Sequence, residues 1–403
     1  MSSTLFQNVT LAPRDPILGL NEQFAADPRT DKVNLGVGVY FDEQGRLPVL
    51  ACVAEAERQL LGAGKPKGYL PIDGIAAYDR AVQGLVFGPD SAALRVGRVA
   101  TVQALGGTGG LKLGADFLAR LGPSATVLIS DPSWENHRAL FTQAGFEVAT
   151  YPYYEATTRG VRFEAMISAL RAARAGSIVV LHACCHNPTG CDLTAAQWTE
   201  VIEACRAGSL VPFLDLAYQG FGDGIAEDGA VVRRFVEAGR PFLISTSFSK
   251  SFSLYGERVG ALSVVCDDAE EAARVLSQLK IVIRTNYSNP PTFGAQVVAT
   301  VLTTPALRQM WEHELAGMRE RIRAMRQALV AGLRAAGIPA DAGQLDYITR
   351  QKGMFSYSGL SAAQMQRLRS EFGVYGVDSG RICVAALNHG NLPKVVAALA
   401  KVM

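Results

Sequence analysis

The feature that most constrains the fold is an alternation, between about residues 74 and 300, of short apolar runs with longer stretches of helical pattern. The runs that predict strands are Thr126 to Ser130, Ser177 to His182, Val211 to Leu216, Phe242 to Ser245 and Gly260 to Val265. Helical stretches such as Leu111 to Leu121 and Ala195 to Ala207 lie between them. This alternation is typical of α/β proteins, in which helices cover both faces of a mostly parallel sheet. We therefore expect an α/β fold with a large domain built on such a sheet.

Polar side chains follow four of the predicted strands, at the point where each strand ends. The segments are Asp131 to His137, His186 to Gly190, Asp215 to Tyr218 and Ser245 to Lys250. Ligands of open α/β sheets bind beyond the carboxyl ends of the strands. The four segments are therefore predicted to meet at one site.

A long amphipathic helix is predicted after this region. Apolar residues recur at helical spacing from Leu307 to Leu333, and Gly337 follows them as a stop signal. Thr304 and Pro305 precede the run as an N-cap and first-turn pair. A helix over about residues 305–336 would have roughly 30 residues and a length of about 45 Å, which is typical of a helix that joins two domains.

The predicted domain organisation places this helix between two units. Residues 46–312 form the large domain, and residues 1–45 and 313–403 form an N-terminal arm and a smaller α+β domain. The first 20 residues, which carry Pro13 and Pro16, are predicted to be irregular.

Composition excludes several classes of function. The chain has 403 residues, a net charge of +2 and a mean hydropathy of +0.14, so its charge balance gives no support for nucleic-acid binding. No apolar run approaches the roughly 20 residues that a membrane span requires, and the start MSSTLFQNVT lacks the features of a signal peptide. Seven cysteines, none in a CxxC pair, are typical of reduced thiols. We expect a cytoplasmic protein with no metal, nucleic-acid or membrane partner.

The segment STSFSKSFSLYGERVG, residues 245–260, carries the sharpest chemical signal. Ser247 and Arg258 can hydrogen-bond the oxygens of a phosphate. Lys250, if desolvated beside another cation, has a lowered pKa and becomes a nucleophilic amine that can form a Schiff base. These are the requirements of pyridoxal 5′-phosphate, an aldehyde with a phosphate tail. Taken alone, a lysine after serine is more often a solvated surface residue.

Asp215, in FLDLAYQG, lies at the end of an apolar run, where an acidic side chain needs a charged partner. A protonated pyridine nitrogen would be such a partner, and the ion pair would keep the ring an acceptor of electrons. Tyr218 can bond the phenolic oxygen of the same ring.

Other candidates have a functional and a purely structural interpretation. Gly107 and Thr108, in ALGGTGGLKL, suit a phosphate at a helix N-terminus or close helix packing. Trp134 suits a stacking platform or a filled core. Asn187 lies in an Asn-Pro turn, a common element. Arg381 suits a bound carboxylate or a surface ion pair.

Together these stretches resemble the fold-type I aminotransferases that use pyridoxal phosphate, in the class I aspartate and aromatic group, over essentially the full length. The matching motifs are YLPIDG, GGTGG, SDPSWENH, CCHNPTG, DLAYQGF, SFSKSFSLYGERVG, IRTNYSNPP, GMFSYSGL and SGR. The resemblance implies that Lys250 bonds the cofactor and moves a proton between the substrate's Cα and the cofactor's C4′. It implies that Asp215, with His137 behind it, pairs with the pyridinium, and that Tyr218 and Asn187 contact the phenolic oxygen.

The resemblance also implies a homodimer with shared sites. Trp134 resembles the stacking residue, and Tyr69 resembles a phosphate contact that reaches in from a second subunit. The cofactor's phosphate would be held by Gly107, Thr108, Ser247 and Arg258. The α-carboxylate side of the substrate would lie against Arg381, Asn187 and the backbone at Gly38. Arg284 resembles the arginine that the neighbouring subunit supplies to a distal carboxylate.

Within the group, the chain resembles the bacterial aromatic, or tyrosine, branch. Glu135 follows Trp134 where aspartate enzymes usually have proline, and GLSAAQ and RICVAAL also match the aromatic branch. Asn289 matches the aspartate branch instead. The implied function is transfer of the amino group of tyrosine, phenylalanine and also aspartate to 2-oxoglutarate by a ping-pong mechanism. The alternative is aspartate aminotransferase as the main activity.

Two other classes stay open. One is a different pyridoxal-phosphate activity on the same scaffold, such as a β-lyase or a decarboxylase, which Arg284 disfavours because it suits dicarboxylate exchange. The other is a non-catalytic sensor, which would need an appended DNA-binding segment, and we expect residues 1–30 to be too short and to carry too little net charge for one.

Overall fold

The computed structural model describes residues 4–12, 15, 17–64, 66–338 and 345–403. Its centre is a seven-stranded sheet in the order β2-β10-β9-β8-β7-β3-β4. The strands are β2 (Val99–Leu105), β3 (Thr126–Asp131), β4 (Glu147–Pro152), β7 (Ile178–His182), β8 (Val211–Leu216), β9 (Phe242–Ser247) and β10 (Val259–Val265). Strand β10 is antiparallel to both of its neighbours, and the other neighbouring pairs are parallel. The predicted mostly parallel sheet is confirmed.

The two edge strands, β2 and β4, were missing from the prediction. Their sequences, VATVQAL and EVATYP, interrupt the apolar residues with polar ones, so neither forms a continuous apolar run. Near the N-terminus, strand β1 covers only Val33–Asn34.

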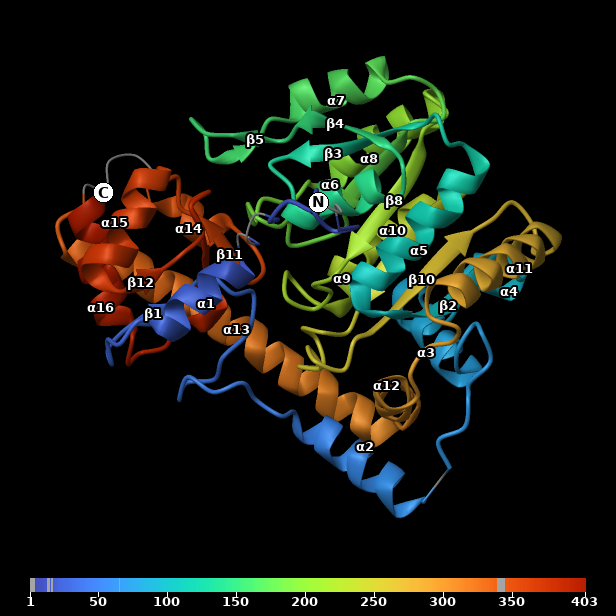
Figure 1. Cartoon of the computed structure of the whole chain (residues 1–403), viewed down its shortest axis with the longest axis horizontal. Helices are drawn as coiled ribbons and strands as arrows, with labels where there is room; N and C mark the ends of the chain where they lie inside the picture. Colours follow the sequence, from blue (N-terminus) through green and yellow to red (C-terminus); the bar gives the residue numbers. More distant parts are fainter. Residues whose placement is uncertain (1–3, 13–14, 16, 65, 339–344) are drawn as a thin grey trace.

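Helices cover both faces of the sheet (Figure 1). One face, which includes Phe213 of β8 and Leu243 of β9, packs against α5 (Gly106–Leu121), α6 (Glu135–Gln143) and α11 (Ala269–Asn286). The opposite face, which includes Leu214 and Ile244, belongs to a larger core. That core also contains α2 (Ala51–Gly62), α3 (Ala76–Phe87), α7 (Phe163–Ala172), α8 (Ala195–Ala207), α10 (Ala230–Glu237) and α12 (Phe293–Thr303). Neighbouring residues of one strand therefore point to opposite cores, as the two-residue period of a strand requires.

The long helix is α13 (Pro305–Ala335), close to the predicted bounds of 305–336. It runs from the helices beside the sheet to a C-terminal group of short elements (Figure 1). This group contains α14 (Asp346–Arg350), β11 (Phe355–Tyr357), α15 (Ala362–Phe372), β12 (Val374–Tyr375), β13 (Arg381–Cys383), η2 (Val384–Ala386) and α16 (Leu392–Val402). The remaining short elements are α4 (Ala92–Arg95), β5 (Tyr154–Glu155), β6 (Gly160–Val161) and α9 (Ile225–Asp228).

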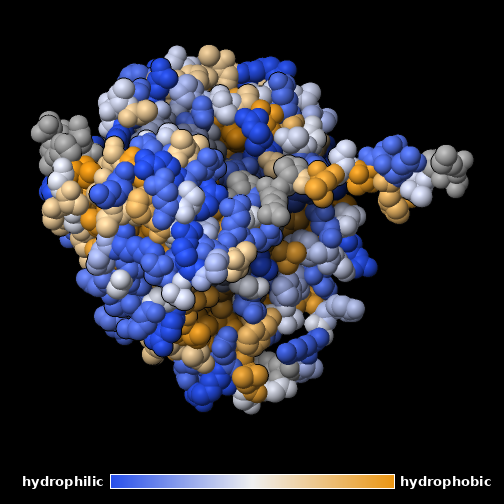
Figure 2. Space-filling model, turned by 60° about the vertical axis from the view of Figure 1, so that its left-hand side comes forward, coloured by the Kyte–Doolittle hydropathy of each residue, from blue (hydrophilic) through white to orange (hydrophobic). Residues whose placement is uncertain are grey.

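The N-terminal segment joins this C-terminal group, because β1 pairs in parallel with β12. Helix α1 (Leu18–Ala26) begins before the end of the predicted irregular arm, and Pro13 and Pro16 lie outside the described residues. Residues 4–12 project from the body of the molecule (Figure 2). The division into domains at residues 45/46 and 312/313 stays a prediction. No helix in the described ranges combines the length and the apolar character needed to cross a membrane.

Candidate active site

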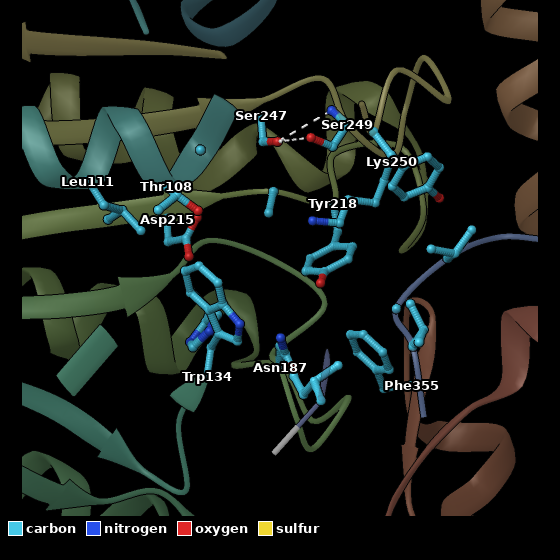
Figure 3. Close-up of a pocket in the computed structure, with 18 of the residues that line it drawn as sticks. Thr108, Leu111, Trp134, Asn187, Asp215, Tyr218, Ser247, Ser249, Lys250 and Phe355 are labelled. Atoms are coloured by element: carbon cyan, nitrogen blue, oxygen red, sulfur yellow. Dashed lines mark hydrogen bonds between the residues drawn. The ribbon is translucent and has the colours of Figure 1, made fainter. Parts of the chain in front are cut away.

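A cavity of about 260 Å³ lies at the carboxyl ends of the parallel strands, and residues of the C-terminal group complete its wall. All of the predicted site residues except Tyr69 and Arg284 line it: Gly38, Gly107, Thr108, Trp134, Asn187, Asp215, Tyr218, Ser247, Lys250, Arg258 and Arg381. Figure 3 shows side chains from several different elements pointing into this one space. The structure thus brings together residues that the sequence places far apart.

Asp215 lies near the end of β8, two residues after Phe213, and therefore points to the α5 and α6 side of the sheet. There its Oδ2 lies 3.0 Å from Nε2 of His137, in the first turn of α6. Nδ1 of His137 lies 2.9 Å from the hydroxyl of Ser133. Burial by itself raises the pKa of Asp215, but the hydrogen bond and charge of His137 outweigh it and hold this pKa below its usual value. The carboxylate is therefore ionised and buried.

His182 belongs to the same cluster, although sequence reasoning did not single it out. It is the last residue of β7 and lies opposite Asp215 in the strand register. Burial, and then the charge of His137, lower the pKa of His182 to about 3, so the imidazole is neutral at neutral pH. Neither ring nitrogen has a hydrogen-bond partner among the described residues.

Lys250 lies in the turn that follows β9, across the cavity from Asp215 (Figure 3). Burial lowers the pKa of its amine to about 8, and the charges of Arg258 and Arg381 act in the same direction, whereas Asp215 opposes them. Its Nζ lies 5.1 Å from the ring centre of Tyr218. A large fraction of this amine is therefore neutral, and nucleophilic, slightly above neutral pH.

An anion cradle lies beside Lys250. Helix α5 begins at Gly106, earlier than the predicted Leu111, so the first-turn N–H groups point toward the cavity. The guanidinium of Arg258 donates to the hydroxyl of Ser249 at 3.2 Å and to the carbonyl of Tyr255 at 3.0 Å. A Cβ atom at Gly106 would lie 2.4 Å from Nη2 of Arg258, so only glycine allows this close approach. Helix N–H groups, hydroxyls and a guanidinium together suit a phosphate.

Arg381, on β13, is a buried cation that faces the cavity from the opposite side. Only 1% of it is exposed, which rules out the alternative of a surface ion pair. Its Nη2 donates to the carbonyl of Gly36 at 2.7 Å, and its Nη1 donates to Oδ1 of Asn187 at 3.2 Å. The ring of Phe355 lies 4.4 Å from the guanidinium carbon. Its Nε has no hydrogen-bond partner in the described part of the chain, so the group is suited to a bound anion.

Tyr69 and Arg284 lie elsewhere. Tyr69 is 96% exposed, and Arg284 lies exposed near the end of α11, where it donates to the hydroxyl of Ser288. A single chain therefore does not bring these two side chains to its own cavity.

Several lining residues were missed by sequence reasoning: Ile17, Val37, Val39, Leu111, His182, Ala217, Ser249, Tyr255 and Phe355. Ser249, Tyr255 and Phe355 fall within recognised motifs and could have been found there. The apolar residues carry no chemical signal of their own, and only the packing of the chain brings them to the cavity.

Known proteins resemble this chain over nearly its whole length. The family model "Aminotransferase class I and II" matches residues 30–399. An aspartate aminotransferase of Pseudomonas aeruginosa is 60% identical and an aromatic-amino-acid aminotransferase of Escherichia coli is 55% identical, each over 99% of this chain and 100% of the relative. A crystal structure of an aromatic-amino-acid aminotransferase from Burkholderia pseudomallei, covalently bound to pyridoxal phosphate, superposes with a TM-score of 0.96 at 63% identity, covering 99% of this chain and 100% of that one. The chain belongs to the class I and II aminotransferases.

Proposed function

We propose that this aminotransferase is an aromatic-amino-acid aminotransferase, which moves the amino group of tyrosine or phenylalanine, and also of aspartate, to 2-oxoglutarate. The observation that carries the proposal is the position of Lys250, an amine with a lowered pKa in one cavity with the buried carboxylate of Asp215 and the anion cradle at Arg258. The relatives named above support both the aromatic and the aspartate activity. A substrate panel therefore decides the order of preference.

The cofactor is pyridoxal phosphate, and the residues of the cavity fit it. When bound, this cofactor bonds an amine through its aldehyde and withdraws electrons through its protonated ring. Its phosphate would be held by Gly107, Thr108, Ser247 and Arg258, which line one part of the cavity. Asp215, ionised and backed by His137, would hold the proton on the ring nitrogen. Trp134 would cover one face of the ring.

Two side chains handle the remaining protons. The Nζ of Lys250 is neutral in a large fraction of molecules slightly above neutral pH, so it can take a proton from the substrate's Cα and return it to a neighbouring carbon. Burial raises the pKa of Tyr218, so its hydroxyl keeps its proton and acts as a hydrogen-bond donor. Asn187 would support the same oxygen through its amide.

The α-carboxylate of an amino acid would bind Arg381, whose unpartnered Nε and buried position favour an anion. Asn187 accepts a hydrogen bond from Arg381, and Gly38 packs against Phe355, whose ring lies against the guanidinium of Arg381. This contact is common to aromatic and acidic substrates, so it orients them equally and does not distinguish them.

We also propose a homodimer with shared sites, in which Tyr69 and Arg284 complete the cavity of the partner subunit. Their exposure in a single chain supports this proposal. The projecting residues 4–12 add a further apolar surface, since Leu5, Phe6, Val9 and Leu11 are exposed (Figure 2). The seven cysteines, all in the described part of the chain, are free thiols, which supports a cytoplasmic location.

The aspartate branch remains the second candidate, because Asn289 matches it and the Pseudomonas aeruginosa relative bears that name. The test is kcat/KM for tyrosine, phenylalanine and aspartate with 2-oxoglutarate as the common acceptor. Tyrosine and phenylalanine values that equal or exceed the aspartate value support the aromatic assignment. A much higher value for aspartate makes aspartate aminotransferase the main activity, and no transfer from any of the three contradicts both.

A further inference from the structure

We propose that Gln103 is a positioning residue that acts on the active site of the partner subunit. It connects the two segments that carry Tyr69 and Arg284, and so holds both side chains in the positions from which they reach across. This inference rests on the shared sites proposed above.

Gln103 lies on β2, the edge strand of the sheet next to β10, and is only 2% exposed. Its side chain points toward two segments. The first is the loop before α3 that contains Tyr69 to Ile75, and the second is the end of α11 with the loop that joins it to α12 and contains Asn289 and Pro291. Nε2 donates to the carbonyl of Pro291 at 2.6 Å, and Oε1 accepts from the N–H of Ile75 at 3.4 Å. The side-chain amide of Gln103 thus hydrogen-bonds both segments, through Pro291 in one and Ile75 in the other.

The backbone of Gln103 bonds the same two segments. Its N–H donates to the carbonyl of Asp73 at 2.9 Å, and its carbonyl accepts from the hydroxyl of Tyr287 at 3.4 Å. Gly74 packs directly against it, since a Cβ atom there would lie 2.4 Å from Cβ of Gln103, and the positive φ of 105° also favours glycine. A residue with a side chain at position 74 would therefore force the first segment away from β2.

The two segments are also bonded to each other. Nδ2 of Asn289 donates to the carbonyl of Leu70 at 3.1 Å, and Nζ of Lys280 lies 3.0 Å from Oδ2 of Asp73. Tyr69 precedes Leu70 directly, and Arg284 lies between Lys280 and Asn289. The segments that carry Tyr69 and Arg284 therefore form one connected unit, with Gln103 as its buried contact to the sheet.

The direction of the effect follows from what Gln103 does not contact. It is not among the residues that line the cavity of its own chain, whereas the two segments that it holds, the loop with Tyr69 and the end of α11 with Arg284, carry the predicted site residues that lie away from that cavity. A displacement of about 1 Å in a substrate-positioning group can cost about a hundredfold in rate. Loosening the unit should therefore reduce turnover at the partner's site and leave the chain's own site intact.

Hybrid dimers separate the two sites. Chains with two different affinity tags are co-expressed and the mixed dimers purified, each containing one Lys250→Ala chain so that a single site is live. In the first hybrid, Lys250→Ala stands in one chain and Gln103→Met in the other, so the live site receives intact segments. In the second hybrid, one chain carries both Lys250→Ala and Gln103→Met and the other is wild type, so the live site receives the altered segments.

We expect the first hybrid to match a Lys250→Ala/wild-type dimer in kcat/KM for aspartate. The second should be about tenfold lower, the change that a lost hydrogen bond of ordinary strength produces, and should release pyridoxal phosphate more readily. The matched control is Gln83→Met. It removes a glutamine whose Nε2 donates to Oγ1 of Thr101 at 3.0 Å and to the carbonyl of Val99 at 3.4 Å, both on β2, and whose side-chain hydrogen bonds within the described residues reach neither segment. Both hybrids made with it should equal the reference dimer.

Impairment of the first hybrid, or equal activity of the two hybrids, would overturn the proposal. If Gln103→Met does not fold, Gln103→Asn shortens the side chain but keeps its amide, and the same comparison applies. A Lys250→Ala/Arg284→Leu dimer, prepared in the same way, tests the shared site itself. If this dimer regains no dicarboxylate activity over either parent, the shared-site proposal is wrong. The role proposed for Gln103 is then wrong as well, because it depends on the shared sites.

Discussion

Nε2 of His137 lies 3.0 Å from Oδ2 of Asp215, and both side chains are buried at the end of β8. This pair holds an ionised carboxylate in a place where burial alone would raise its pKa. The charge of Asp215 therefore depends on a residue of another element, α6.

Replacing Asp215 with alanine should lower kcat by on the order of 10²- to 10³-fold, as expected for the loss of a buried electrostatic contact to the reacting system. Asp215→Glu, which keeps the charge, should retain more activity. His137→Phe should raise the pKa of Asp215, because only the weaker charges of His182 and Lys250 then oppose the effect of burial, and should move the acid limb of the kcat–pH profile to higher pH. An acid limb unchanged in His137→Phe would show that the pair does not control this carboxylate.

Lys250 should set the pH dependence of cofactor uptake. Its pKa of about 8 lies below the ordinary value of 10.5, so the amine loses its proton, and becomes nucleophilic, as the pH rises through about 8. The rate at which the apo-protein takes up pyridoxal phosphate should rise through the same pH range, measured by stopped-flow absorbance. Lys250→Ala should abolish turnover and the borohydride-trapped adduct. A midpoint near pH 10 would contradict the lowered pKa.

Gly106→Ala should weaken the binding of pyridoxal phosphate. The new Cβ would lie 2.4 Å from Nη2 of Arg258, and the φ of 69° is a strained region for alanine, at about 1–2 kcal/mol. We expect the cofactor Kd to rise about tenfold or more. Gly256→Ala is the control, since a Cβ there meets nothing within 4 Å. Equal affinities in the two variants would place Arg258 outside the cofactor site.

Arg284→Leu should separate the two substrate classes. Removing one member of a buried charge pair costs roughly 2–5 kcal/mol, which is about thirty- to several-thousand-fold in kcat/KM. That loss should appear with aspartate and glutamate, whereas phenylalanine should keep most of its rate in the first half-reaction. Arg274→Leu, an exposed arginine on the same helix, should change neither. Equal losses for both classes would mean that Arg284 is structural.

Arg326→Met should reduce stability and substrate binding together. Arg326, on α13, is 2% exposed and donates to the carbonyls of Ile348, Gly353 and Phe355. Leaving these buried acceptors without donors should lower the free energy of unfolding by about 2–3 kcal/mol, seen as a lower Tm. Since Phe355 lies against Arg381, KM for amino acids should also rise. Arg326→Lys should recover part of both losses, and an unchanged KM would separate α13 from the substrate site.

The sequence by itself determined the local structure and the chemical identity of the site. Apolar runs between helical stretches predicted five of the seven strands of the sheet, and the repeat from Leu307 to Leu333 predicted α13 within about a residue. Strand and helix patterns are set by neighbours along the chain, so they can be recognised without a structure. Asp215 was identifiable because a charged residue at the end of an apolar run needs a specific partner. Lys250 was identifiable from its place between Ser247 and Arg258, together with the motifs that resemble the family.

Only the tertiary structure decided which distant residues meet. Arg381 and Asn187 are 194 positions apart and come together because the folded chain places β13 beside the loop that follows β7. His182 belongs to the site because the strand register places it opposite Asp215. The edge strands β2 and β4 are recognised only from their pairing with β10 and β3, since their sequences lack a continuous apolar run. Such meetings depend on how apolar surfaces of separate elements are buried together, which no single stretch of sequence encodes. In the homodimer proposed above, the exposed Tyr69 and Arg284 would extend this reason beyond one chain, because they would act at the cavity of a second copy.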